Sequence, residues 1–329
     1  MREGERWFFM VNALMLLAMH IACQNQGRGH FLCRMRIAIT GTTGQLGGRL
    51  HALSGSEAAD GMVLIPLGRD RMDLSAPESI PQAIDEAQPD VVLSCGAYTA
   101  VDAAEDDRDM AFRVNGEAPG HLGAACAARN IKVIHISTDY VFNGQGKHPY
   151  LPADPTGPTG VYGASKLAGE SALLATCPSA SIVRVGWLYD RDGQNFLNTM
   201  LRLSKSRDVL TVVDDQWGCP THVGDFAADL LSWVRLGQEE EMATAGVHHY
   251  GHSGVTNWHG FASEIMQHSA PHVRVEPVSS DAFPTRASRP AYSKLDERDF
   301  FKRLGCLPIS WEVGLERCLG AKLDRSKTD

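Results

Sequence analysis

The sequence predicts an α/β fold, a doubly wound parallel sheet of Rossmann type with a second, smaller α+β substrate lobe. Three observations support this. Short apolar runs alternate with helical patterns from Met35 to about residue 190. A glycine-rich turn, TGTTGQLG, joins the first run to the first helix, and a Tyr-x-x-x-Lys pair lies on a later helix. Because such sheets use right-handed crossovers, ligands are expected at the carboxyl ends of the strands.

The strands and helices follow one another in a regular order. Strands are expected at 35–39 (MRIAI), 62–67 (MVLIPL), 90–97 (DVVLSCGA), 131–137 (IKVIHIS) and 180–189 (ASIVRVGWLY). Helices are expected after the glycine turn and at 75–88, 108–130 and 160–177. The run IKVIHIS is apolar almost throughout, as in a parallel strand covered by helices on both faces.

The regular alternation weakens after about residue 190. Short strands and loops between helices are expected at 211–221, 246–254 and 272–280. We therefore predict a dinucleotide-binding domain at 35–190, to which some later segments return, and a mainly substrate-binding lobe at 191–318. Residues 319–329 form a polar tail.

The first 34 residues have a composition of their own. Arg2 and Arg6 precede an apolar run, WFFMVNALMLLAMHIAC (7–23), and this order of charge followed by apolar residues is that of a signal peptide. The first predicted strand opens directly at Met35. We favour the hypothesis that 1–34 is a start-site extension outside the fold, and mass spectrometry of the native N-terminus distinguishes it from a leader.

Composition excludes several classes of protein. The net charge is −8 and the basic residues are scattered, which argues against a nucleic-acid partner. The apolar run at 7–23 is short for a membrane span, so no membrane partner is expected. The eight cysteines show no C-x-x-C pairing and the thirteen histidines no H-E-x-x-H spacing. We predict reduced thiols, a cytoplasmic location and no metal site.

The glycine turn has the context of a dinucleotide fingerprint, since it lies between a strand and a helix. Gly41 would allow the tight turn, Gly44 the approach of a pyrophosphate, and Gly47 the close packing of helix on strand. The helix N-terminus would then offer its amides to the phosphates. The spacing is G-x-x-G-x-x-G rather than G-x-G-x-x-G.

Tyr162 and Lys166 lie four residues apart and share one helix face. An ammonium beside a phenol lowers the phenol pKa, which suits proton donation to an oxyanion made by hydride delivery. The alternative is a solvated helix face. Ser137, Thr138 and Asp139 follow an apolar strand, and a hydroxyl there would bond both a substrate oxygen and the tyrosine. The alternative there is a simple turn that closes the strand.

Together, the glycine turn, the strand-end hydroxyl and the Tyr-x-x-x-Lys pair are typical of the extended short-chain dehydrogenase/reductase superfamily. Within it, the chain from about Met35 to about residue 318 resembles the dTDP-4-dehydrorhamnose reductase family. The similar stretches are TGTTGQLG, AYTAVDAAE (97–105), STDYVFNG (137–144), PTGVYGASKLAGE, RVGWLYDRDGQNF (184–196), DDQWGCPT (214–221) and SRPAYSKLD (288–296).

The resemblance implies a role for each matching residue. Tyr162 would protonate the C4 oxygen of a 4-keto sugar, and Lys166 would bond the nicotinamide ribose and lower the tyrosine pKa. Thr138 takes the place of the usual superfamily serine. Thr138 and Asp139 would touch the sugar, and Trp187 would lie by its C6 methyl.

The resemblance also implies a cofactor site. Gly44, Gln45 and Leu46 would line the pyrophosphate. Ala97, Tyr98 and Thr99 would flank the cofactor, and Asp73 and Leu74 would border its adenine. Strand two ends in Leu67-Gly68-Arg69-Asp70-Arg71, without the acid that binds a free ribose 2′-hydroxyl. We predict a preference for NADPH gripped by Arg69 or Arg71, while Asp70 leaves use of NADH open. The alternative is that both arginines are solvated loop charges.

The reaction implied is the reduction by NADPH of dTDP-4-dehydro-6-deoxy-L-mannose, a nucleotide sugar, to dTDP-L-rhamnose. The alternatives are another nucleotide-sugar reductase or epimerase of the superfamily, and a non-catalytic homologue like the regulatory subunit of methionine adenosyltransferase. Some family members dimerise through a magnesium ion held by glutamates. Arg49 occupies one of those places here, so no such metal site is predicted, and a homodimer remains open.

Overall fold

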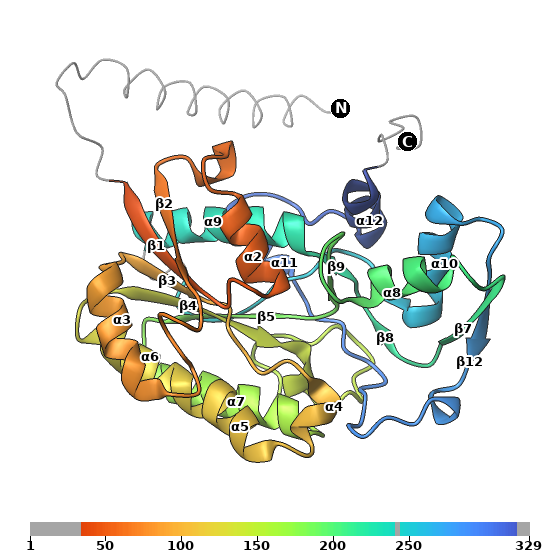
Figure 1. Cartoon of the computed structure of the whole chain (residues 1–329), viewed down its shortest axis with the longest axis horizontal. Coiled ribbons are helices and arrows are strands. Elements are labelled where there is room, and N and C mark those ends of the chain that lie inside the picture. The colour runs from red at the N-terminus through yellow and green to blue at the C-terminus, as the bar shows by residue number, and fades with distance from the viewer. Residues whose placement is uncertain (1–33, 241–243, 321–329) are drawn as a thin grey trace, which may run out of the picture. The chain divides into compact units, whose positions relative to one another are not determined.

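A six-stranded parallel sheet forms the centre of the molecule in the computed structural model, which describes residues 34–240 and 244–320 (Figure 1). The predicted extension up to residue 33 and the tail from 321 lie outside the described residues. The strands, in the spatial order β10-β5-β4-β3-β1-β2, are Gly246–His249, Ser181–Val185, Lys132–Thr138, Val91–Ser94, Met35–Thr40 and Met62–Leu67. The predicted fold class is confirmed.

The strand order reverses between β1 and β3. The chain runs from β1 outward to β2 and then returns past β1 to β3, after which β4 and β5 continue in the other direction. Crossovers on the two sides of this point lie on opposite faces of the sheet and leave a crevice at the carboxyl ends of the strands. This crevice is where the site lies.

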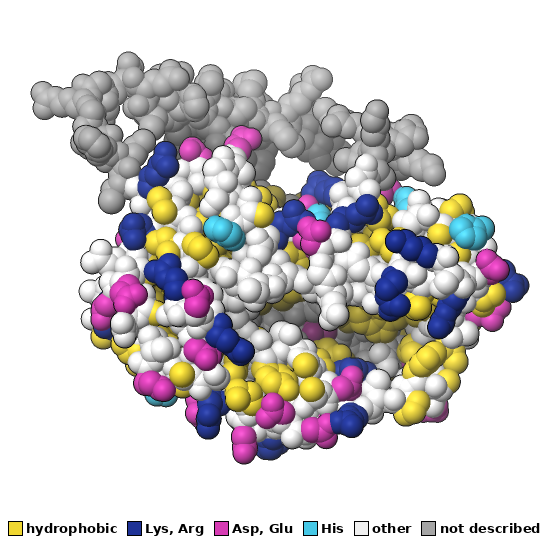
Figure 2. Space-filling view, in the orientation of Figure 1, with side chains coloured by type: hydrophobic (Ala, Val, Ile, Leu, Met, Phe, Trp, Pro, Cys, Tyr) yellow, Lys and Arg dark blue, Asp and Glu magenta, His cyan; other side chains and the backbone are white. Residues whose placement is uncertain are grey.

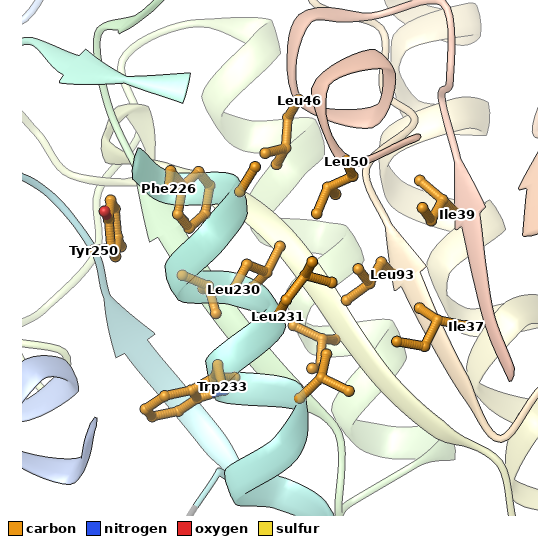
Figure 3. Close-up of a cluster of buried hydrophobic side chains, with 14 of the residues drawn as sticks. Ile37, Ile39, Leu46, Leu50, Leu93, Phe226, Leu230, Leu231, Trp233 and Tyr250 are labelled. Atoms are coloured by element: carbon orange, nitrogen blue, oxygen red, sulfur yellow. The ribbon is translucent and has the colours of Figure 1, made fainter. Parts of the chain in front are cut away.

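Helices cover both faces of the sheet (Figure 1). Helices α2 (Gln45–Ala52), α9 (Val223–Glu239) and α11 (Arg298–Leu304) lie on one face, and α3 (Ile80–Ala87), α6 (Ala118–Ala127) and α7 (Val161–Thr176) on the other. Successive side chains of β1 point to opposite faces of the sheet. Ile37 and Ile39 belong to one buried cluster and Ala38 to the other. Figure 3 shows the first cluster, in which Leu230 and Trp233 of α9 face the sheet.

A second lobe lies beyond the carboxyl ends of the strands (Figure 1). It consists of α8 (Phe196–Leu203), α10 (Trp258–Ser269), α12 (Trp311–Leu319) and the parallel pair β7 (Val209–Val213) and β12 (Arg274–Val278), around a core of its own. Its short strands are β6 (Leu188–Tyr189), β8 (Trp217–Gly218), β9 (Thr221–His222) and β11 (Thr256–Asn257). Since α9, β10 and α11 lie on or in the central sheet, later segments do return to it, and the boundary at residue 190 stays a prediction.

The expected helix at 108–130 is three segments instead of one. A π-helical turn, η3 (Arg113–Glu117), separates α5 (Arg108–Phe112) from α6. The side chain of Asn115 accepts a hydrogen bond from the amide of Tyr98 at 2.8 Å and donates to Ser165 at 3.0 Å. These long-range hydrogen bonds stabilise the π-helical turn, which is wider than an α-helical one and directs the side chain of Asn115 inward.

The expected strand at 180–189 is also interrupted, at Gly186 and Trp187. A Cβ on Gly186 would lie 2.6 Å from a carboxylate oxygen of Asp139, and Trp187 has a φ of 52°. The chain therefore leaves the sheet where it meets the cleft. The remaining short elements are η1 (Glu57–Ala59), η2 (Pro77–Ser79), α4 (Val101–Ala104), η4 (Asp139–Val141) and η6 (Ser280–Ala282).

We predict that Gly169→Ala destabilises the fold by about 2 kcal/mol or more. Gly169 is buried on α7, and a Cβ there would lie 1.9 Å from the carbonyl oxygen of Asn115. Urea unfolding measures the change. Ser171→Ala, on the exposed side of the same helix, is the control and should leave the midpoint almost unchanged. Equal midpoints for the two variants would contradict the packing.

Candidate active site

A cleft of about 1060 Å³ opens at the carboxyl ends of the central strands. Four segments line it: the glycine turn with α2, the end of β3, the end of β4, and the chain that leaves β5, together with Tyr162 and Lys166 of α7. The cleft therefore lies at the switch point between β1 and β3, and Figure 2 shows the described surface hollowed near the middle of one face.

The glycine turn brings two stretches of backbone into direct contact. Gly41 has a φ of 67°, and a Cβ on it would lie 2.6 Å from the Cα of Gly96 at the end of β3. A Cβ on Gly47 would lie 2.3 Å from the carbonyl oxygen of Gly41. Gly47 thus allows α2 to pack directly against the backbone of the turn that precedes it. The sequence predicted a contact between helix and strand at this position, whereas the closest contact found is with the turn.

The N-terminus of α2 faces the cleft with its amides open. Gly44 is the N-cap residue, no side chain caps the helix, and its first turn has no acidic residue. Gly44, Gln45 and Leu46 line the cleft. Uncapped amides at a helix N-terminus, approached over glycine, are the donors that a pyrophosphate needs. These residues fit a dinucleotide.

Tyr162 and Thr138 meet at the cleft. Loss of hydration on burial raises the pKa of Tyr162 well above its ordinary value, although a hydrogen bond with Thr138 lowers it. The hydroxyl of Thr138 also donates to Oδ1 of Asp139, at 3.0 Å. The structure thus brings together the strand-end hydroxyl and the helix phenol, as the sequence predicted.

Lys166 is buried below the tyrosine, with 2% of its surface exposed. Its Nζ donates to the carbonyl oxygen of Ile136 at 2.7 Å and contacts Nε2 of His135 at 3.1 Å. Burial lowers the pKa of Lys166 to about 8. The lowering of the Tyr162 pKa by Lys166 that the sequence predicts is not seen in this arrangement, because burial dominates and the described bonds of Lys166 go to β4.

Trp187 forms one wall of the cleft in a strained conformation. Its φ of 52° is rare for a bulky residue. The indole stacks on Trp258 with ring centroids 3.5 Å apart and planes at 1°, and its Nε1 donates to Ser293 at 3.1 Å. The strain persists because these contacts determine the orientation of the ring.

Asp139 lies buried beside this wall, with 2% of its surface exposed. Burial raises its pKa to about 6, against hydrogen bonds from Ser293 and Thr138 that lower it. A carboxyl group with a pKa this high is charged at neutral pH at a cost in stability.

The structure does not bring all the predicted cofactor residues to the cleft. Ala97 and Thr99 line it, whereas the described lining does not include Tyr98, Arg69, Asp73 or Leu74. Arg69 has 81% of its side chain exposed, and its Nε lies 3.7 Å from Oδ1 of Asp73. Their cofactor roles stay predictions.

Sequence reasoning missed four residues of the site. His135, Trp258 and Ser293 contact Lys166 or Trp187, and no local pattern predicts these contacts because the partners are distant in the chain, although Ser293 lies in the stretch SRPAYSKLD. Asp190 also lines the cleft and holds Arg49 in a two-point ion pair, with N–O distances of 2.8 and 2.5 Å.

Asp190, His222 and Cys318 place three potential metal ligands within 4.8 Å of one another. The carboxylate of Asp190 already accepts both bonds of Arg49 and the amide of Arg191 at 2.7 Å. An adjacent guanidinium opposes a second cation. We derive no metal site from this group.

Known proteins resemble the chain over most of its length. The family model described as RmlD substrate binding domain matches residues 35–323. The dTDP-4-dehydrorhamnose reductase of Burkholderia thailandensis is 40% identical over 87% of this chain and 98% of its own. That of Streptomyces griseus is 39% identical over 89% and 95%.

The chain belongs to the dTDP-4-dehydrorhamnose reductase family.

Solved structures agree with this assignment. The Bacillus anthracis dTDP-4-dehydrorhamnose reductase, in complex with NADP, has a TM-score of 0.80 at 34% identity and covers 88% of this chain and 100% of that one. The Clostridium acetobutylicum structure has a TM-score of 0.79 at 35% identity, with 87% and 99% covered. A Thermus thermophilus UDP-glucose 4-epimerase, 20% identical with a TM-score of 0.70, shares the fold.

Among the helices of the described part of the chain, none has both the length and the apolar character that a membrane span requires.

We predict that Asp139→Asn stabilises the protein at neutral pH but not at acidic pH. The folded-state pKa of Asp139 is about 6, against 3.8 for an unperturbed aspartate, so its ionisation costs stability as the pH rises from about 4 to about 6. The cost is fully present above pH 6 and reaches about 3 kcal/mol. Asparagine still offers an oxygen to Thr138 without that charge.

Urea unfolding at pH 4.5 and pH 7.5 measures this difference. The free energy of unfolding of the Asp139→Asn variant, relative to the parent protein, should rise between the two values. Asp60→Asn, at an exposed loop position, should show no such rise. An equal effect of Asp139→Asn at both pH values would mean that the carboxyl is already ionised at pH 4.5.

Proposed function

We propose that the protein reduces the C4 ketone of dTDP-4-dehydro-6-deoxy-L-mannose with NADPH and so forms dTDP-L-rhamnose. The observation that carries this function is the meeting of Tyr162, Thr138 and Lys166 in one cleft with an uncapped helix N-terminus, in a member of the reductase family. NADPH supplies the hydride when bound, and the chain supplies the proton and the binding groups.

The cofactor would be held by the glycine turn. The amides of α2 beyond Gly44 would bind the pyrophosphate, with Gln45 and Leu46 beside it. Ala97 and Thr99 line the next part of the cleft, at the end of β3. In our proposal the adenine extends beyond the cleft towards Asp73 and Leu74, and a 2′-phosphate is met by Arg69.

Tyr162 is the proton donor. Its raised pKa means that the phenol keeps its proton at neutral pH until negative charge develops on the C4 oxygen. The phenol O–H bond then breaks, the proton goes to the C4 oxygen, and a phenolate remains. In our proposal the hydroxyl of Thr138 then turns its single proton from Asp139 to the phenolate, and the positive charge of the buried Lys166 stabilises the phenolate as well.

The sugar would lie between Trp187 and Asp139. The indole face suits the C6 methyl of a deoxysugar. Oδ2 of Asp139 is buried and lacks a hydrogen-bond partner among the described residues, so it is available to accept from a sugar hydroxyl. We propose a nucleotide sugar as the partner molecule on this basis. The assembly state of the chain stays open, and a homodimer is compatible with it.

We place the reaction in the cytoplasm. The cysteines of the described part of the chain are free thiols, and most of them are buried. Burial raises the pKa of Cys126, Cys219 and Cys318 to about 12, which keeps these thiols unreactive. Free cysteines without disulfide bonds are typical of proteins in a reducing compartment.

The direct test is a coupled assay. The purified protein is incubated with the dTDP-4-keto sugar precursor, a 3,5-epimerase and NADPH. Loss of NADPH coupled to formation of dTDP-rhamnose supports the proposal. NADPH loss with a different product would indicate another nucleotide-sugar reductase, and the absence of turnover with intact NADPH binding would favour a regulatory homologue.

We predict that Tyr162→Phe lowers kcat by roughly 10²–10⁴-fold, because only the proton donor is lost. NADPH binding should change little, since the ring and its packing against Tyr140 are kept. Steady-state rates and a fluorescence titration with NADPH give the two values. Near-parental turnover in the variant would overturn the role of Tyr162.

We predict a higher kcat/KM with NADPH than with NADH, and that Arg69→Ala lowers the value for NADPH roughly tenfold. Arg69 is exposed and only loosely paired, which leaves its guanidinium available to a phosphate. Arg71 already donates to the carbonyl oxygen of Pro66 at 3.1 Å, so Arg71→Ala is the matched control with a smaller effect. A clear preference for NADH would contradict this prediction.

A further inference from the structure

A row of buried polar side chains crosses the central sheet beneath α7. Ser94 of β3 lies opposite His135 of β4, and Ser137 of β4 lies opposite Arg184 of β5. His135 and Ser137 are two residues apart on β4, so both face α7. Lys166 of α7 contacts His135, while Glu170, one turn later, contacts Ser137 and Arg184. The mechanism above uses only Lys166 from this set.

The ammonium of Lys166 has three donors and no acceptor. One donor goes to the carbonyl oxygen of Ile136, at 2.7 Å, and a second to the ring of His135, at 3.1 Å. Both partners lie on β4, and Lys166 also lines the cleft. The two contacts thus hold the lysine head against the strand and leave one donor for the cleft.

These bonds determine the tautomer of His135. Because an ammonium only donates, Nε2 of His135 must accept, and the ring proton then lies on Nδ1. Nδ1 lies 3.0 Å from the hydroxyl oxygen of Ser94, which accepts it. Burial and the charge of Lys166 lower the pKa of His135 well below its ordinary value, so the ring stays neutral.

We propose that His135 is a positioning residue for the reduction, in which its Nε2 holds the Lys166 ammonium and directs the one remaining donor to the cofactor ribose, next to Tyr162. The proposal rests on the proposed function and deepens it. His135 touches neither substrate nor cofactor in this scheme and acts only through Lys166.

The other groups around Lys166 do not replace this acceptor. Glu170 on the same helix favours the charged lysine, but its carboxylate is held by Arg184 of β5 and by Ser137. Cys95, at the end of β3, is a neutral thiol because burial raises its pKa to about 12. Tyr162 lies one helical turn before Lys166 and holds its proton. Among the described residues, the hydrogen bonds of Nζ all go to β4.

Two amide substitutions test the two hydrogen bonds of the His135 ring one at a time, the bond of Nδ1 to Ser94 and the bond of Nε2 to Lys166. His135→Asn keeps a polar group within reach of Ser94 but is too short to supply an acceptor at the position of Nε2. His135→Gln reaches that position with its amide oxygen. Both replacements are neutral and polar, so they serve as a matched pair whose urea midpoints should differ little from each other.

We expect the alkaline limb of the kcat/KM profile to move down by about one pH unit in His135→Asn and to stay in place in His135→Gln. Without its acceptor the buried ammonium is less stable, its pKa falls further below about 8, and the charged form is lost earlier as the pH rises. A purely structural defect would lower the rate without moving the limb.

NADPH affinity provides a readout that does not need the sugar. At pH 8.5 we expect His135→Asn to bind NADPH roughly tenfold more weakly, and His135→Gln within about twofold of the parent, because one charge-assisted hydrogen bond is misdirected. If the sugar is not reduced, the proposed function fails while this titration still tests His135. Equal effects of the two substitutions on affinity and on the pH profile would overturn the role of His135.

A double-substitution cycle with Lys166→Met decides whether His135 acts through the lysine. If it does, His135→Asn should change NADPH affinity less than about twofold in the Lys166→Met background. The same tenfold loss in both backgrounds would show that His135 acts independently of Lys166, and would also overturn the proposal.

Discussion

The structure depends on a charged helix face that is buried against a parallel sheet. Lys166 and Glu170 of α7 have 2% and 3% of their surface exposed, and Glu170 pairs with Arg184 across a 2.6 Å contact. An unpaired charge at this depth costs several kcal/mol, so each must find its partner on the sheet. Helix α7 can then sit in only one register over β4 and β5.

That register places the groups that we propose as catalytic. Tyr162 lies one turn before Lys166 on the same face, so once Lys166 is bonded to β4 the phenol reaches the end of that strand. Thr138 is the last residue of β4 and meets the phenol there. The buried charges of α7 thus fix this helix over β4, so that Tyr162 and Thr138 meet at the edge of the sheet.

Backbone constraints shape the rest of the cleft. Gly41 allows the turn after β1 to pack against the backbone of Gly96, and Gly47 allows α2 to pack against the backbone of Gly41. In this arrangement the first amides of α2 face the cleft without a side-chain cap. Gly186 makes room for the buried carboxylate of Asp139, and the next residue, Trp187, is held in a strained conformation against Trp258. Backbone strain of this kind often occurs at functional sites and supports our proposal that Trp187 contacts the sugar.

The sequence by itself determined the order of strands and helices, the glycine turn, and the places of Tyr162, Lys166 and Thr138, because periodicity and glycine sterics are local properties. It predicted one helix at 108–130, whereas Asn115 widens a turn there to bond Tyr98 and Ser165. Only the tertiary structure decided that burial raises the pKa of Tyr162, that His135 meets Lys166, and that Trp258 and Ser293 hold Trp187. These contacts join segments far apart in the chain, and hydration, on which a pKa depends, is set by whatever packs around a group.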